Sequence, residues 1–210
     1  MSIHFIISGA VKIQNITHSL FIERDTEYKL CLHKIFHYKK PVHAIISECT
    51  KEESKETSFS KFSFSSELYI PSTKDLNAKG KSQQEFLSIQ GYVKNTTIFN
   101  DEDWIIKVSG RYLLLSDFFM DTVKNAPKEC DAVVKVTDTT NQICTFCFAL
   151  RWKHFKKLYL HDVNDINKVG HQCIEDFVYY YIVHNKLKTI VVPKLDILTN
   201  INSEGIYRIY

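Results

Sequence analysis

The sequence predicts an α/β fold with a mixed, mostly parallel central sheet flanked by helices. In its first half, short apolar runs rich in β-branched residues alternate with helical patterns, the order that parallel crossover units require. In its second half, two apolar runs are separated only by the turn-prone segment 137–141, which indicates antiparallel pairing. A chain of 210 residues, 44% of them hydrophobic, can bury one large core, so a single domain spanning 1–210 is expected.

Each element follows from a local pattern. Apolar, β-branched runs predict strands at 3–8, 42–49, 67–73, 103–115, 131–136 and 142–152, and a strand followed by an extended tail over 188–198. Apolar residues at helical spacing predict helices at 25–40, 82–95, 116–125 and 171–186. The second helix opens with Ser82 and Glu85 at the spacing of a capping box, in which each side chain satisfies a free amide. The segment 50–66, rich in Ser, Lys and Glu, is interpreted as a mobile surface excursion.

Charge and composition limit the class of protein. The 27 basic and 24 acidic residues leave a net charge of +3, so bulk charge does not indicate a polyanionic partner. The six cysteines are scattered and do not resemble a disulfide framework. No apolar run approaches the roughly 20 residues of a membrane span, and the first residues lack the pattern of a secretory signal. A cytoplasmic protein without a membrane span is expected.

Two cations interrupt one of the most apolar runs, "WIIKVSGRYLLL". Lys107 lies near the carboxyl end of this predicted strand and Arg111 follows Gly110, which allows the backbone to turn. Ligands of open α/β sheets collect outside the carboxyl ends of strands, and both side chains suit a phosphate. A second interpretation has equal weight: Lys107 extends toward solvent, and Arg111 pairs with a buried carboxylate such as Asp103 or Asp117.

The acidic residue before "DWIIKVSGRYLL" and the short helix after it resemble the lysine-x-x-glycine-arginine-tyrosine segment of small GT-A-like glycosyltransferases. These enzymes occur in bacterial surface-polysaccharide clusters and large DNA viruses, the chlorella-virus type among them. The pieces "ISGA", "STKDLNAKGKSQQEFL" and "EDFVYYYI" fall in the family's order. The similarity covers most of the chain loosely and is sharp around 101–113. It implies a GT-A-like (Rossmann-like) fold, with a nucleotide-sugar-binding half at 1–115 and an acceptor half at 116–210.

The resemblance implies transfer of a hexosyl or deoxyhexosyl group from a nucleotide-diphosphate sugar, a UDP-sugar in the first place, to a glycan or glycoprotein. The site must then neutralise the charge that grows on the departing diphosphate. Lys107 and Arg111 would do this directly, or Asp101, Asp103 or Asp138 would recruit Mn²⁺ or Mg²⁺. The family's Asp-x-Asp motif follows a strand, whereas Asp101 and Asp103 precede one, so the first mechanism is favoured.

Further residues are expected on the donor side. Ser8, Gly9 and Asn15 lie at and beyond the end of the first strand, from where a nucleotide's base and ribose are commonly contacted. A tight turn alone would also require Gly9. Gly110 and Tyr112 belong to the segment that carries the resemblance, and they complete the predicted donor site.

On the acceptor side, Glu175 and Asp176 open the late helix, where the helix dipole favours carboxylates. Charge complementarity at a helix start is the more frequent reason for acids there. The pair is nevertheless similar to the acid of inverting GT-A enzymes that deprotonates the attacking hydroxyl. The resemblance therefore implies Asp176 as the base, with Glu175 second, and a retaining enzyme would need neither.

The segment 151–159, "RWKHFKKLY", supports a different class. Interleaved cations and aromatic rings suit single-stranded nucleic acid, where bases stack on the rings. The low net charge makes nucleic acid the less favoured partner. A noncatalytic domain of the same fold also stays open, as does fusion to further domains. If the protein is viral, the host cytoplasm is its expected location.

Overall fold

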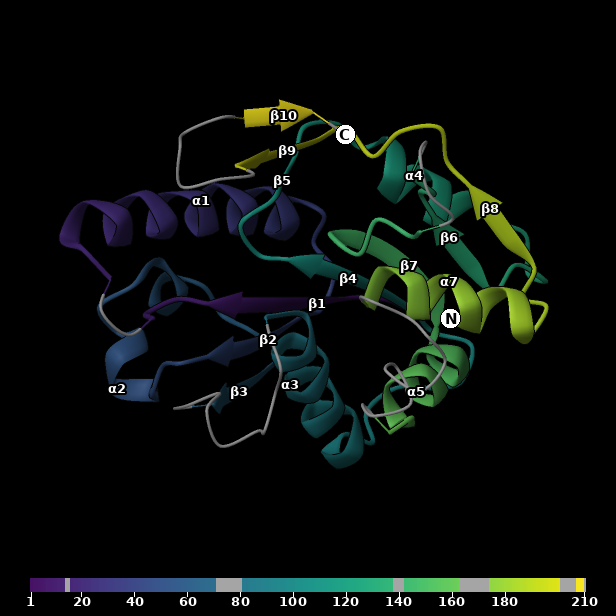
Figure 1. Cartoon of the computed structure of the whole chain (residues 1–210), viewed down its shortest axis with the longest axis horizontal. Coiled ribbons are helices and arrows are strands. Elements are labelled where there is room, and N and C mark those ends of the chain that lie inside the picture. The colour runs from purple at the N-terminus through teal and green to yellow at the C-terminus, as the bar shows by residue number, and fades with distance from the viewer. Residues whose placement is uncertain (14–15, 71–80, 138–141, 163–173, 201–206, 210) are drawn as a thin grey trace.

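A seven-stranded sheet of order β3-β2-β1-β4-β7-β6-β8 crosses the centre of the protein (Figure 1). The computed structural model describes residues 1–13, 16–70, 81–137, 142–162, 174–200 and 207–209. The strands are β1 (Ile3–Ala10), β2 (Val42–Ser47), β3 (Ser66–Ile70), β4 (Trp104–Ser109), β6 (Ala132–Val134), β7 (Cys147–Arg151) and β8 (Thr189–Val191). β3, β2, β1 and β4 are parallel, β7 is antiparallel to β4 and to β6, and β8 is parallel to β6. The predicted mixed, mostly parallel sheet is confirmed.

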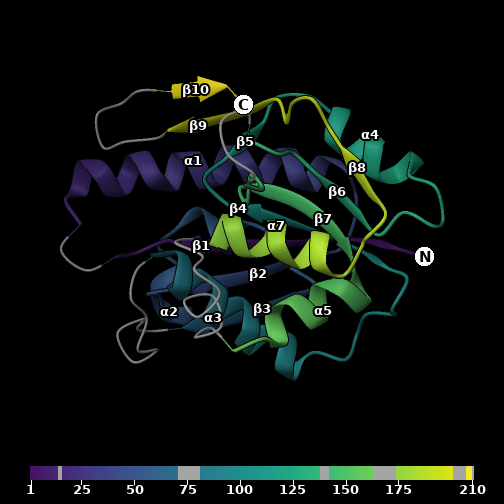
Figure 2. The same cartoon turned by 45° about the vertical axis from the view of Figure 1, so that its right-hand side comes forward.

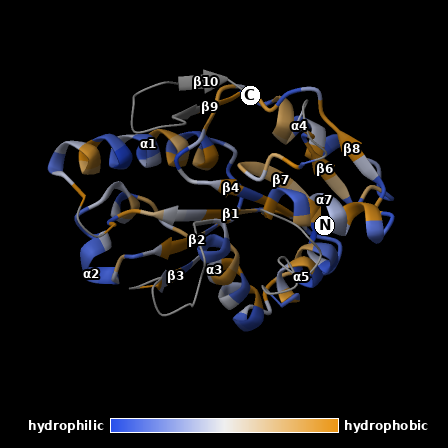
Figure 3. Cartoon of the chain, viewed as in Figure 1, coloured by the Kyte–Doolittle hydropathy of each residue, from blue (hydrophilic) through white to orange (hydrophobic). Residues whose placement is uncertain are grey.

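Helices cover both faces of this sheet and bury two apolar cores. One core lies under α1 (His18–His37) and α4 (Phe118–Asn125). The other lies under α3 (Lys81–Asn95), α5 (Trp152–Leu160) and α7 (Ile174–His184). Figure 3 shows hydrophilic and hydrophobic stretches alternating along these helices, as expected when one side of a helix is buried. No helix in the described part of the chain is long and apolar enough to cross a membrane.

A small antiparallel sheet lies beside α1 in both views (Figure 1, Figure 2). It consists of β5 (Leu113–Leu114), β9 (Ile197–Asn200) and β10 (Tyr207–Ile209). The single strand predicted over 103–115 is therefore two strands in two sheets, because the chain turns at Gly110. This turn places Arg111 between the two sheets.

Side-chain alternation along β1 and β4 decides which residues face α3. Phe5 packs in the core under α1, whereas its neighbour Ile6 packs in the core under α3. Ile6 is paired in register with Lys107, and Ser8 with Ser109. Partners in a parallel ladder project to the same side, so these side chains all lie on the α3 face of the sheet.

The segment 50–66 does not fit the prediction of a mobile excursion. It forms α2 (Lys51–Ser54) and a short 3-10 helix, η1 (Ser58–Lys61), and α2 begins with a capping box between Thr50 and Glu53. Phe59 is 2% exposed and packs against Tyr28, with ring centroids 5.2 Å apart. That prediction was wrong, because the segment is polar in composition but is held to the core by the buried side chain of Phe59.

Candidate functional site

The boundary between β1 and β4 is the point at which the strand order reverses. From β1 the chain adds β2 and β3 on one side and then returns to place β4 on the other. Ligands of open α/β sheets bind outside the carboxyl ends of strands at such a switch point. Near these ends, Glu85 of α3 links both strands, because its Oε1 accepts hydrogen bonds from the hydroxyls of Ser8 and, at 3.2 Å, Ser109.

Lys107 lies beside these hydroxyls and is enclosed, with 1% of its side chain exposed. Its Nζ is 2.9 Å from Oε1 of Glu85, 2.8 Å from Oγ of Ser109 and 2.8 Å from the carbonyl oxygen of Thr145. An ammonium group has three protons, so these three acceptors use all of them. Lys107 is therefore enclosed by described residues, and a contact with diphosphate would require one of these bonds to break.

Glu85 is the site residue that the sequence patterns misassigned. α3 begins at Lys81, so Ser82 lies inside the helix and cannot be its N-cap. Burial by itself would raise the pKa of Glu85, but the charge of Lys107 and the hydrogen bonds from Ser8, Lys107 and Ser109 outweigh burial and lower it. Glu85 is therefore a carboxylate at neutral pH. It forms an ion pair with Lys107 and does not cap the helix.

Thr145 connects this network to the late helix. Its Oγ1 donates a hydrogen bond of 2.8 Å to Oε1 of Glu175, while its carbonyl oxygen accepts a hydrogen bond from Nζ of Lys107. Glu175 and the half-buried Asp176 lie in the first turn of α7, as predicted. The structure thus brings three predicted residues, Ser8, Lys107 and Glu175, into one network. We call it the switch-point cluster, and its members are Ser8, Glu85, Lys107, Ser109, Thr145 and Glu175.

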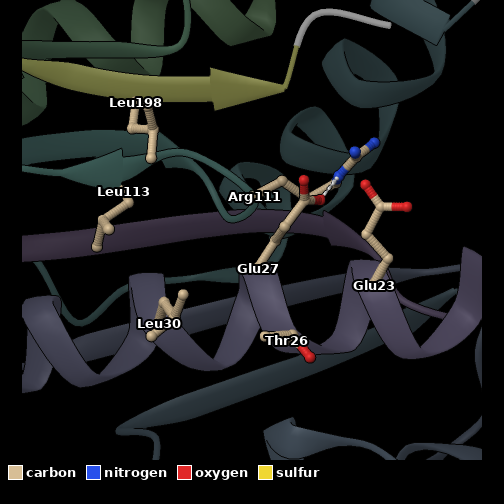
Figure 4. Close-up of a pocket in the computed structure, with 7 residues that line it drawn as sticks. All are labelled: Glu23, Thr26, Glu27, Leu30, Arg111, Leu113 and Leu198. Carbon is tan, nitrogen blue, oxygen red and sulfur yellow. Dashed lines mark hydrogen bonds and ion pairs between the residues drawn. The ribbon is translucent and has the colours of Figure 1, made fainter. Parts of the chain in front are cut away.

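Arg111 lies on the other face of the sheet, beside α1. Its Nε donates to Oε2 of Glu27 at 2.6 Å, and the two side chains are 27% and 9% exposed (Figure 4). Burial would lower the pKa of Arg111, but the hydrogen bond and charge of Glu27 raise it overall. The interpretation that Arg111 pairs with an internal carboxylate is confirmed, although neither Asp103 nor Asp117 is the partner. Arg111 and Lys107 therefore do not converge on one site.

A pocket of about 200 Å³ opens between α1 and the small sheet at this ion pair (Figure 4). Its lining residues are Glu23, Thr26, Glu27, Leu30, Arg111, Leu113 and Leu198. Glu27 and Arg111 of this lining pair with each other, and Glu23 adds a second carboxylate. The terminal nitrogens of Arg111 have no acceptor among the described residues.

The two glycines of the predicted donor site make room for Tyr28. A Cβ atom at Gly9 would lie 2.9 Å from the ring of Tyr28, and one at Gly110 would lie 2.9 Å from that ring and 2.8 Å from Ile7. The hydroxyl of Tyr28 accepts from the amide of Ala10 at 2.8 Å and donates to its carbonyl oxygen at 3.1 Å. Tyr28 of α1 thus packs against the ends of β1 and β4 and forms hydrogen bonds with the end of β1.

Gly110→Ala is expected to lower the free energy of unfolding by about 1–3 kcal/mol, because the new methyl group overlaps two buried side chains. Gly91→Ala is the matched control. A Cβ there meets nothing within 4 Å, and the position is inside α3, so a gain of up to about 1 kcal/mol is expected. Urea denaturation of both variants measures the difference, and equal stability would contradict the packing argument.

The remaining donor-side residues are placed as follows. Tyr112 is partly buried against Phe146, with ring centroids 4.5 Å apart, and burial raises its pKa to about 12. Asn15 and Asp138 lie outside the described residues. The nucleotide contacts expected of Asn15 and Tyr112 and the metal ligation expected of Asp138 stay predictions.

The other predicted metal ligands lie at the opposite end of β4 from the switch point. Asp101 and Asp103 precede Trp104, and the carboxylate of Asp103 accepts from the amides of Ser2 at 2.6 Å and Asn100 at 2.9 Å. Burial would raise the pKa of Asp103, but these hydrogen bonds lower it. Neither aspartate fits a metal that bridges a diphosphate at the carboxyl ends. Within the described ranges, no group of three or more His, Cys, Asp or Glu residues could hold a metal ion.

The basic and aromatic segment 151–159 offers no stacking surface. It forms the end of β7 and most of α5, and Trp152, Phe155 and Tyr159 are each at most 3% exposed. Lys153 on the outer side pairs with Glu102 at 3.1 Å. The suggestion that these rings stack on nucleic-acid bases is wrong, because they form part of the core.

Comparison with known proteins identifies the fold. No protein-family model and no curated protein matches the sequence. Among solved structures, the chain is similar to 4-diphosphocytidyl-2C-methyl-D-erythritol synthase of Anaerococcus prevotii (12% identity, 91% of this chain and 88% of that chain, TM-score 0.58). It is also similar to mouse xyloside xylosyltransferase 1 (8% identity, 90% and 85%, TM-score 0.55). A third is a galactosyltransferase crystallised with donor and acceptor sugar analogues (7% identity, 90% and 73%, TM-score 0.51). The chain therefore has a GT-A-like fold, with a mixed, mostly parallel sheet flanked by helices.

Proposed function

We propose that the chain is a glycosyltransferase that takes a hexosyl or deoxyhexosyl group from a UDP-sugar and passes it to a hydroxyl of a glycan or glycoprotein. The observation that supports this most is the switch-point cluster. It places charged and hydroxyl groups at the carboxyl ends of β1 and β4, where ligands of such sheets bind, in a fold shared with sugar transferases.

In this proposal the donor lies across the ends of β1 and β4. Ser8 and Gly9 border its nucleoside, and Arg111 contacts the diphosphate through its terminal nitrogens, which no described residue binds. Lys107 is not assigned a diphosphate contact, because its ammonium protons are already directed to Glu85, Ser109 and Thr145. Asp176 accepts the proton of the acceptor hydroxyl as its oxygen bonds to the sugar and the bond to the diphosphate breaks. That role applies if the enzyme inverts the configuration of the sugar.

Thermal unfolding in the presence of UDP, GDP, CMP and their sugars tests the proposal. One nucleotide class is expected to stabilise the protein, by about 3 kcal/mol when its concentration is 100 times the dissociation constant. Repeating the measurement with Mn²⁺ and with EDTA shows whether a divalent ion takes part. Stabilisation by none of these compounds would contradict the proposal and favour a noncatalytic domain of the same fold.

A second candidate is nucleotidyl transfer. The similar structure from Anaerococcus prevotii carries the name of a synthase with a diphosphocytidyl product, so the fold alone does not separate the two reactions. The products do separate them. Release of UDP from a UDP-sugar supports glycosyl transfer, whereas release of pyrophosphate from a nucleoside triphosphate and a sugar phosphate supports nucleotidyl transfer.

Arg111→Ala is expected to weaken UDP binding about 10- to 100-fold, because charge-assisted hydrogen bonds to the diphosphate are lost. Stability should also fall, since Glu27 keeps a buried carboxylate without its partner. Glu27→Gln is the control, because it removes the ion pair and leaves the guanidinium. Calorimetric titration with UDP should therefore show a large change for Arg111→Ala alone, and equal affinities in both variants would remove Arg111 from the site.

A further inference from the structure

At the switch point the chain presents a carboxylate where a cation was expected. Oε1 of Glu85 accepts from Ser8, Lys107 and Ser109, whereas no described residue donates to Oε2. The side chain is 28% exposed, although Lys107 beside it is enclosed. The group available to a ligand here is therefore an oxygen acceptor that carries negative charge.

The negative charge and lone pairs of Glu85 limit which ligand groups can bind beside it. A carboxylate repels phosphate at close range, and its remaining lone pairs require O–H or N–H donors. The protons of Ser8 and Ser109 already point to Oε1, so both hydroxyls also offer lone pairs. Three neighbouring acceptors match a set of hydroxyl groups on a sugar ring better than an anion.

We propose that Glu85 recognises ring hydroxyls of the donor, either on the ribose or on the transferred sugar, and that Lys107 is the residue that positions it. This inference rests on the proposed function. Lys107 holds Oε1 through an ion pair and keeps Glu85 ionised, which fixes the direction of Oε2. The diphosphate then lies away from Glu85, on the side of Gly110 where Arg111 is found.

Matched ligands with and without single hydroxyls test the assignment. Affinities of UDP, 2′-deoxy-UDP and 3′-deoxy-UDP report on the ribose, and affinities of UDP-glucose and its deoxyglucose analogues report on the transferred sugar. The native protein is expected to bind the fully hydroxylated ligand about 10- to 100-fold more tightly in one of these series, as for a hydrogen bond to a charged group. Glu85→Gln should reduce that preference to within about threefold, because the anionic acceptor is lost.

Two further variants separate recognition from folding. Lys107→Met keeps the carboxylate but removes the ion pair that fixes its orientation, so the ratio between the affinities for the hydroxylated and the deoxy ligand should fall toward one. The paired replacement E85Q/K107M removes both charges together and should fold, yet it should show no preference. Glu52→Gln, an exposed position on α2, should keep the native ratio. A folding defect would weaken all ligands alike and leave the ratio unchanged.

The outcomes distinguish the two proposals. If the native protein binds UDP or UDP-sugars but shows no hydroxyl preference, or if Glu85→Gln retains the preference, the role of Glu85 is overturned and the proposed function stands. If no nucleotide or nucleotide sugar binds at millimolar concentration, both are overturned.

Discussion

Replacing Lys107 by methionine is expected to lower the free energy of unfolding by about 3 kcal/mol and the melting temperature by roughly 6–12 °C. The ammonium is enclosed and makes an ion pair with Glu85 and hydrogen bonds to Ser109 and Thr145. Removing it leaves a carboxylate without its counter-charge, and leaves a carbonyl oxygen and a hydroxyl without a donor. Urea denaturation and thermal unfolding at neutral pH measure the loss.

Two comparison variants make this result specific. The double variant E85Q/K107M removes both charges and is expected to recover at least half of the stability lost in Lys107→Met, because no uncompensated charge remains. Lys124→Met, at an exposed position of α4, should change stability by no more than about 0.5 kcal/mol. A Lys107→Met variant as stable as the native protein would show that the ion pair does not form.

The layered fold was predictable because it depends on local patterns. The order of apolar runs and helical periodicities is visible in the sequence, and it requires parallel crossovers in the first half. Several boundaries were not visible, and two of them affect the site and the rejected nucleic-acid surface. The apolar run around Gly110 is divided between two sheets, and the pattern shows no break because both parts are apolar in sequence. Trp152 begins a helix directly after β7, and its aromatic neighbours suit either a strand or a buried helix face.

The site was only partly predictable because its ion pairs join residues far apart in the chain. Periodicity can place Lys107 on one face of a strand, but it does not reveal which acid approaches from the covering helix. Glu85 lies three residues after Ser82, which is the spacing of a capping box. The same position also allows Glu85 to form an ion pair with a residue far away in the chain, and the spacing does not distinguish the two. Likewise nothing near Arg111 in the sequence points to Glu27, which lies 84 positions away. Charged residues in apolar runs indicate a buried network, and only the fold identifies its members.

A second strong effect is expected from two histidines at the amino-terminal ends of β1 and β2. Nδ1 of His4 lies 3.3 Å from Nε2 of His43, whose Nδ1 lies 2.8 Å from the hydroxyl of Ser66. Phe99 makes a T-shaped contact with each of the two rings, and the ring of Tyr92 is 6.2 Å from that of His43. His43 is 1% exposed. Burial, and then the charge of His4, lower the pKa of His43 to about 4 from its ordinary value of 6.5.

The protein is therefore expected to lose stability as the pH falls from 6.5 toward 4. In this window the unfolded chain binds a proton at His43 and the folded protein does not, so acid favours unfolding. The contribution is fully present above pH 6.5, and its loss approaches about 3 kcal/mol below pH 4. His4→Asn and His43→Gln should each flatten this part of the curve of unfolding free energy against pH, even if they lower stability at pH 7.5. His37→Gln, at an exposed position of α1, should keep the native slope. A native curve that is flat between pH 6.5 and 4 would show that the pair is protonated equally in both states.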